Sequence, residues 1–245
     1  MMIAGSTILV TGANRGLGGA LLEEALRRGV NRVYAGVRQA FVHPDHRVMP
    51  LMLDVTSAAQ IRAAVKKVDA LDILINNAGI SLRSDLSDRA ALERVLAVNL
   101  FGTYDVIQAF LPRLAHPRSA IVNVVSLAAL AAAPFDSLYS ISKAAALSLS
   151  QSLRALLAGQ GVSVHVVLPG PVDTDMARNL DFPKVSPASV AQAILDGVEK
   201  EREEIFPDPM SASIAEGWRG GAVKALERQF AAYAEASLIK SSATG

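Results

Sequence analysis

The stretch Thr7-Ile8-Leu9-Val10-Thr11-Gly12-Ala13-Asn14-Arg15-Gly16-Leu17-Gly18 decides the fold of this chain. Its first four residues predict a strand, and apolar residues at helical spacing from Leu17 to Arg28 predict a helix that ends at Gly29. Three glycines, spaced Gly-x3-Gly-x-Gly, lie between the strand and the helix. Glycines allow a tight turn and let a pyrophosphate approach the N–H groups of a helix N-terminus. A plain tight turn would use the same residues, but their position after the first strand favours nucleotide binding.

The alternation of strand and helix patterns continues to the end of the chain. Further strands are expected at residues 32–37, 48–53, 72–76, 120–125, 162–168 and 204–206. Further helices are expected at 56–68, 87–114 with a bend near Asn99, 139–158, from Pro187 onward and at 222–236. The strands lack polar alternation, which predicts a mainly parallel sheet with helices on both faces. We therefore predict a doubly wound α/β fold of about seven strands, with residues 1–245 as one domain and a tail at 211–245 that contains a helix.

The composition excludes several classes of function. The chain has 245 residues, of which 51% are hydrophobic, so it can bury a large core, and its net charge of +1 gives no reason to expect nucleic acid as a partner. It has no cysteine, which excludes disulfides and thiol chemistry, and we expect no metal site. No apolar run reaches the roughly 18 residues that cross a bilayer, and the N-terminus shows no signal-peptide pattern. We expect a cytoplasmic protein that does not bind membranes.

Tyr139 and Lys143 form a second pattern that points to chemistry. A spacing of four places the phenol and the ammonium one turn apart on the same helix face. A nearby cation favours the phenolate, so the pair can give a proton to a carbonyl oxygen, or take one from an alcohol, near neutral pH. Ser126 lies thirteen residues before Tyr139. Taken singly, Tyr139 could serve packing and Ser126 could cap a strand end.

Five motifs together resemble those of the short-chain dehydrogenase/reductase family, in its compact subgroup. They are TGANRGLG at 11–18, NNAG at 76–79, Asn99, Ser126 with YSISK at 139–143, and PGPVDT at 169–174. The resemblance covers residues 5 to 206 and implies a Rossmann-type oxidoreductase domain. It also implies four catalytic residues, Asn99, Ser126, Tyr139 and Lys143.

Each of these four residues has a role that the resemblance implies. Tyr139 would be the general acid in reduction and the general base in oxidation, while Lys143 would lower the pKa of Tyr139 and bind the nicotinamide ribose. Ser126 would donate a hydrogen bond to the substrate oxygen. Asn99 would bend its helix and help to hold a water that links Lys143 to solvent.

The same resemblance implies where a cofactor binds. The expected cofactor-binding residues are Gly12, Asn14, Arg15, Gly16, Leu17, Gly18, Arg38, Asp54, Val55, Asn77, Ala78, Gly79, Tyr139, Lys143, Pro169, Gly170, Val172 and Thr174. Asp173 and Asp175 are expected to cap a short lid helix. The fifteen residues between Arg38 and Asp54 leave little room for the helix that usually connects the second and third strands.

Two arginines indicate which cofactor is preferred. A carboxylate at the end of the second strand would bind the 2′-hydroxyl of NAD, but this chain has Arg38 there, and Arg15 precedes the second motif glycine. A guanidinium suits a phosphate because it makes forked, charge-assisted hydrogen bonds. The sequence therefore predicts NADP(H) in preference to NAD(H), unless both arginines are simply solvated.

The predicted function is hydride transfer between NADP(H) and a ketone or aldehyde, or the matching secondary alcohol. The substrate pocket is expected between segments 80–86, 127–138 and 173–187, and the apolar middle segment favours an apolar substrate. The alternative is a regulatory or sensor protein that binds NADP(H) without significant turnover. By resemblance, a homodimer or homotetramer is expected, assembled through the helices that carry Asn99 and Tyr139.

Overall fold

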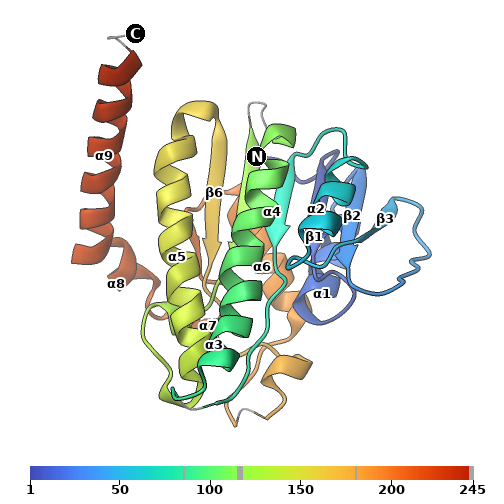
Figure 1. The fold of residues 1–245 in the computed structure, drawn as a ribbon, viewed down its shortest axis with the longest axis horizontal. Helices are drawn as coiled ribbons and strands as arrows, with labels where there is room; N and C mark the ends of the chain where they lie inside the picture. Colours follow the sequence, from blue (N-terminus) through green and yellow to red (C-terminus); the bar gives the residue numbers. More distant parts are fainter. Residues whose placement is uncertain (85, 115–117, 180, 243–245) are drawn as a thin grey trace.

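The computed structural model describes residues 1–84, 86–114, 118–179 and 181–242, with backbone only from 234 onward (Figure 1). Seven strands form one sheet in the order β3-β2-β1-β4-β5-β6-β7, and every pairing between neighbours is parallel. The strands are β1 (Thr7–Thr11), β2 (Arg32–Val37), β3 (Val48–Met52), β4 (Ile73–Asn76), β5 (Ser119–Val124), β6 (Val162–Val167) and β7 (Glu204–Ile205). The predicted doubly wound α/β fold with helices on both faces is thus confirmed.

Helices cover both faces of this sheet. One face carries α1 (Gly16–Arg27) and α6 (Pro187–Glu199). The other carries α2 (Ala58–Val65), α3 (Arg89–Leu96), α4 (Thr103–Phe110) and α5 (Ser137–Leu157), of which α4 and α5 stand in front of the sheet in Figure 1. Short helical turns lie at Ala97–Gly102, Leu111–Arg113, Leu127–Ala129, Pro134–Asp136, Ala158–Gln160 and Asp175–Ala177.

The alternation of side chains along β1 explains the two cores. Ile8 and Val10 are fully buried against the α1 and α6 side, whereas Leu9 is fully buried in the cluster under α2, α4 and α5. Each such side chain contributes about 1.5–3 kcal/mol when it is removed from water. A strand that is apolar at every position can therefore lie only between two layers of helices.

The helix starts follow capping chemistry, and some differ from those that the sequence predicts. Of the two candidate caps Thr56 and Ser57, it is Ser57 that caps α2, by accepting a hydrogen bond from Gln60 N at 3.3 Å. The helix expected from residue 87 begins later, because Asp88 caps α3: its carboxylate accepts from Ala91 N at 2.8 Å. Ser186 caps α6 with Pro187 at the first position, as expected.

The bend predicted near Asn99 takes the form of a π-helical turn over Ala97–Gly102, between α3 and α4. Such turns often occur at functional sites. The combined stretch 89–113 is long and apolar enough to cross a membrane by length and composition alone. Its inward side chains Val106, Ile107 and Phe110 are fully buried in the core, as in a helix that packs on a sheet.

Two regions complete the fold. Residues 38–47, between β2 and β3, form a loop without helix, as the short spacing predicted. After β7, the chain forms α7 (Pro209–Ala212), α8 (Ala215–Arg219) and α9 (Ala222–Ser242), so the tail helix is longer than the expected 222–236, and residues 243–245 lie outside the described part. In Figure 1, α9 stands beside α5 at the outer edge of the molecule.

The glycines of the first turn are required by close backbone contacts. Gly12 has φ +68°, a left-handed conformation that favours glycine. At Gly18, a Cβ atom would lie 2.1 Å from the Gly12 carbonyl oxygen and 2.5 Å from Asn77 Nδ2. The turn can therefore pack against the end of β4 only if position 18 has no side chain.

The change Gly18→Ala should lower the free energy of unfolding by about 1–3 kcal/mol, because the new methyl group forces backbone atoms apart. Gly19→Ala is the matched control, since a Cβ there comes no closer than 3.6 Å to any neighbour and the position is helical. That change should be neutral or stabilising by up to about 1 kcal/mol. Urea unfolding of the two variants measures the difference, and equal stability would contradict the packing argument.

Candidate active site

A cleft of about 1100 Å³ opens at the edge of the sheet where the strands end. Every predicted cofactor-binding residue lines this cleft, and so does Ser126. Of the predicted catalytic residues, Asn99 alone is not part of the lining; it is buried behind it. The structure thus brings four of the sequence motifs together around one cavity, at the point where the strand order reverses between β1 and β4.

The glycine turn and the N-terminus of α1 can hold a phosphate group. Arg15, the residue before α1, makes no side-chain cap, and the first turn contains no acidic residue. The first N–H groups of the helix therefore have no capping partner and attract an anion. At Gly16, a Cβ atom would lie 3.3 Å from Thr174 Cγ2, so the PGPVDT segment closes over the turn from the other side.

The NNAG segment shapes the turn as well as the cleft. Asn77 Nδ2 donates to Thr11 O at 3.0 Å, and Thr11 Oγ1 accepts from the backbone N–H groups of Asn77 and Ala78, each at 3.0 Å. These bonds tie the end of β4 to the end of β1. The role of Asn77 is therefore partly structural.

Tyr139, Ser126 and Lys143 meet in the cleft wall. The Ser126 side chain, at the end of β5, lies close enough to the Tyr139 hydroxyl on α5 to favour its ionised form as a hydrogen-bonding partner. Lys143, one turn further along α5, is 5% exposed; its Nζ lies 5.5 Å from the centroid of the Tyr139 ring and donates to Val124 O at 2.8 Å. Two hydroxyl groups are thus held side by side, with a buried amine behind them.

Burial sets the ionisation of this pair. Desolvation raises the pKa of Tyr139 to about 12, against the opposing effect of the Ser126 hydrogen bond and with a further increase from the charge of Asp136. Desolvation lowers the pKa of Lys143 to about 8. The pKa of Tyr139 is therefore raised overall, because burial disfavours the phenolate, and the lowering effect of Lys143 stays a prediction.

Asn99 acts as a clamp between two elements. Its Oδ1 accepts from Ile80 N at 2.9 Å, and its Nδ2 donates to Ile80 O at 2.8 Å and to Ser142 Oγ at 2.9 Å. The amide thereby fixes the segment after β4 against the residue that precedes Lys143. Its part in holding a water stays a prediction.

The two arginines lie at the end of the cleft formed by β1, β2 and α1. Arg38 is exposed and close enough to Asp54 that its charge, with two hydrogen bonds from Thr56, keeps the pKa of Asp54 low despite burial, which would raise it. Arg15 forms an exposed ion pair with Asp175, 3.2 Å from Nη1 to Oδ2. Asp175 also pairs with Arg178.

These ion pairs correct the expectation for the lid. No side chain caps the turn at Asp175–Ala177, and its N-cap residue is Thr174. Asp175 therefore forms ion pairs with two arginine side chains instead of capping a helix. The backbone N–H of Asp173 donates to Val185 O.

The remaining wall of the cleft is formed as expected in part. The lining includes residues from all three predicted segments, with Phe135 and Phe182 in contact at 5.8 Å between ring centroids; Asp85 and Leu180, which fall in those segments, lie outside the described residues. Sequence reasoning missed Arg83 as a second charge near Asp136, and it missed Met210 and Ile214 after β7. The glycines around Trp218 indicate a turn that packs on the body or covers the cleft, but they do not identify these two residues.

The described parts of the chain contain no group of three or more His, Asp or Glu side chains that could hold a metal ion. The cleft is thus a nucleotide-sized cavity with a phosphate-binding turn at one end and a Ser–Tyr–Lys set at the other. This combination of fold and site defines a class of dinucleotide-dependent oxidoreductases.

Comparison with known proteins supports the same class of dinucleotide-dependent oxidoreductases. The family model described as short chain dehydrogenase matches residues 6–183, and the chain belongs to this family of oxidoreductases. A short chain dehydrogenase from Burkholderia cenocepacia, solved in complex with NADP, is 38% identical, with a TM-score of 0.85 over 94% of this chain and 98% of that one. The 2,3-dihydro-2,3-dihydroxybenzoate dehydrogenase of Escherichia coli is 36% identical over 74% of this chain and 75% of its own. The ketoacyl reductase HetN of Nostoc is 30% identical over 86% and 82%.

The low pKa of Lys143 makes stability depend on pH. The folded state holds this proton less tightly than the unfolded state, whose lysine pKa is about 10.4. Keeping Lys143 protonated therefore lowers the free energy of unfolding by about 3 kcal/mol below pH 8, and this cost disappears as the pH rises toward 10.5. Relative to the unmodified protein, Lys143→Met should therefore be most stable at pH 7 and lose that advantage between about pH 8 and pH 10.5. Unfolding curves in denaturant at several pH values measure this, and a constant difference between the two proteins would contradict it.

Proposed function

We propose that this protein is an NADP(H)-dependent carbonyl reductase that interconverts a ketone or aldehyde with its alcohol. The observation that carries the proposal is the pairing of the Ser126 and Tyr139 hydroxyls in the wall of a nucleotide-sized cleft, with Lys143 buried behind them. Two hydroxyl donors directed at one oxygen stabilise the charge that develops there when a carbonyl is reduced.

The cofactor, when bound, supplies or accepts the hydride. The residues of this chain do the rest. Ser126 holds the substrate oxygen by a hydrogen bond, and Tyr139 gives that oxygen its proton in reduction or removes it in oxidation. Because burial raises the pKa of Tyr139, the phenol stays protonated at neutral pH, which is the form that donates. Lys143 keeps its place through Val124 O and offers its N–H groups to a bound ribose.

The preference for NADP(H) rests on charge. Arg15 and Arg38 both line the same end of the cleft, and the end of β2 offers Arg38 where a carboxylate would select NAD. The Burkholderia relative with NADP, at 38% identity, supports the same assignment. Glycine-turn N–H groups at 16–18 would bind the pyrophosphate, while Asp54 and Val55 would flank the adenine.

The substrate is proposed as an apolar carbonyl compound or alcohol, because Leu127, Leu130, Phe135 and Phe182 line that part of the cleft. The named relatives act on different compounds, so they do not narrow this class further. We also propose that the protein works in the cytoplasm as a dimer or tetramer. The exposed aromatic residues Phe101 and Tyr104 near Asn99 support assembly through the helices that carry Asn99 and Tyr139.

The change Tyr139→Phe should lower the rate of reduction of ketones and aldehydes by a factor on the order of 10²–10⁴, because it removes the proton donor and leaves the ring in place. Binding of NADPH should persist. Nicotinamide absorbance measures turnover, and Tyr233→Phe, which removes an exposed hydroxyl from α9, serves as the control and should keep full activity. Undiminished turnover in Tyr139→Phe would refute the proposed chemistry; tight NADPH binding without turnover in the unmodified protein would favour a sensor.

The change Arg38→Asp should weaken NADPH binding on the order of a hundredfold and improve NADH binding, because charge-assisted hydrogen bonds to the 2′-phosphate contribute about 1.5–3 kcal/mol each. Titrations of both cofactors measure the shift. Arg62→Asp, on the exposed side of α2, makes the same change in net charge and should leave the ratio alone. Equal affinity for NADPH and NADH in the unmodified protein would rule out the assignment.

A further inference from the structure

The chain after β7 supplies part of the cleft wall. Met210 of α7 and Ile214, which precedes α8, both line the cleft, and a Cβ atom at Gly170 would lie 3.3 Å from Met210 Sδ. Trp218 of α8 packs against the same buried cluster as Leu127 and Leu130, which follow Ser126. This C-terminal wall, residues 208–219, therefore stands on the side of the cleft where the Ser126 loop lies.

The C-terminal wall is bonded directly to the PGPVDT loop and through it to the Ser126 loop. Asp208 is buried; its Oδ2 accepts from Gly170 N at 2.8 Å, and its Oδ1 accepts from Ser211 N at 3.0 Å, at the start of α7. The PGPVDT loop is bonded in turn to the Ser126 loop, because Leu127 N donates to Pro169 O at 3.0 Å. A shift of the wall is therefore transmitted to both loops.

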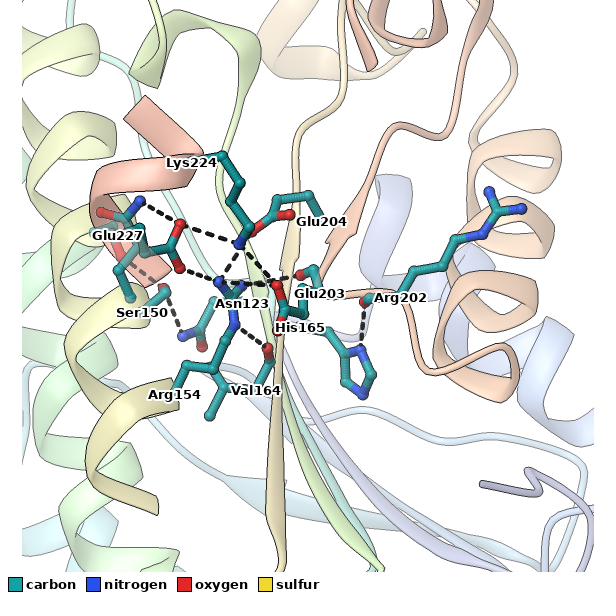
Figure 2. A network of polar contacts seen from close by, with 12 residues as sticks. Asn123, Ser150, Arg154, Val164, His165, Arg202, Glu203, Glu204, Lys224 and Glu227 are labelled. Atoms are coloured by element: carbon teal, nitrogen blue, oxygen red, sulfur yellow. Dashed lines mark hydrogen bonds and ion pairs between the residues drawn. The ribbon is translucent and has the colours of Figure 1, made fainter. Parts of the chain in front are cut away.

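A cluster of charged side chains holds the end of this wall. Figure 2 shows Lys224 of α9 reaching toward three carboxylates, and its Nζ lies 2.7 Å from Glu204, 2.8 Å from Glu203 and 3.0 Å from Glu227. Arg154 of α5 contacts Glu204 at 2.9 Å and also pairs with Glu227. The cluster thus joins α9, α5 and the strand β7.

Lys224 is the member that this arrangement cannot lose. Its side chain is 2% exposed, and it belongs to α9, whereas Glu203 and Glu204 belong to the β7 region. Without it, three carboxylates would keep Arg154 as their ion-pair partner and only the more distant charge of Arg228, which is exposed. An uncompensated buried charge strongly disfavours the packed state. Arg154 would stay fixed to the sheet, since its Nε also donates to Val164 O at 3.2 Å.

We propose that Lys224 is a positioning residue for substrate binding: it holds the C-terminal wall against the cleft, and that wall limits the size and shape of the substrate. The role in substrate selection rests on the proposed function, whereas the role of Lys224 in holding the wall does not. Lys224 itself does not line the cleft, so it acts through α8 and α7 on Met210 and Ile214.

The single tryptophan of the chain provides a test that does not depend on activity. Trp218 lies in the C-terminal wall, with its indole nitrogen buried. In Lys224→Met, which keeps side-chain length and removes the charge, we expect red-shifted Trp218 emission and a rise of about twofold in acrylamide quenching. Hydrogen exchange should become faster in 208–227 and stay unchanged in β1 and β4. The control is Lys200→Met, which makes the same substitution at an exposed lysine after α6.

Kinetics then tests the role in selection. For the best substrates of a panel that contains cyclohexanone and a long-chain methyl ketone, Lys224→Met should raise KM about tenfold, with kcat and the NADPH dissociation constant nearly unchanged. Unchanged quenching and exchange would overturn the positioning role, and so would uniformly faster exchange over the whole sheet. Changed quenching with an unchanged KM would overturn the role in selection.

A second variant covers the case in which Lys224→Met does not fold. Glu227→Gln keeps the shape of the side chain and the contact with Gln151 but removes one charge. It should show the same local changes at smaller size; a fully native Trp218 signal in Glu227→Gln would count against the proposal. If the unmodified protein reduces no carbonyl compound, the proposed function fails, and fluorescence and exchange still decide the position of the wall.

Discussion

The cleft exists because the turn after β1 makes direct backbone contact with the end of β4. Gly12 and Gly18 let the turn close on itself, and Asn77 bonds to it from the neighbouring strand. This contact lies where the order of the strands reverses, so the loops on either side diverge and leave a cavity between them. The N-terminus of α1 points its N–H groups into that cavity, and the end of β5 and the helix α5 bring the reactive side chains to its other wall.

Burial then determines what the reactive side chains can do. Tyr139 and Lys143 are both held in surroundings that disfavour charge, so the phenol stays protonated and the amine loses its proton more easily than a free lysine does. A phenol beside a serine hydroxyl is a proton donor ready at neutral pH, which suits reduction of a carbonyl. The π-helical turn at Asn99 supports this arrangement from behind, because its amide binds both Ile80 and Ser142.

The sequence predicted most of the fold and of the site because both depend on local signals. Apolar runs and helical spacing located every strand and every long helix, and five short motifs identified the residues around the cleft. These local signals fail for features that depend on tertiary contacts. Asp88 and Ser57 are the helix caps, although the residue before each could also cap a helix. The pKa of Tyr139 depends on burial, which residue spacing does not encode. The approach of Met210 and Ile214 to the cleft depends on how the tail folds back, which its own periodicity does not reveal.

In the proposed reaction, hydride passes between a nicotinamide and a carbonyl carbon in this cleft. The most direct measurement incubates the protein with NADPH that carries deuterium at the transferable position, together with a panel of ketones and aldehydes, and analyses the products by mass spectrometry. Hydride transfer to the carbonyl carbon should give an alcohol with one deuterium on that carbon. Saturating NADPH binding with no deuterium in any product would contradict it.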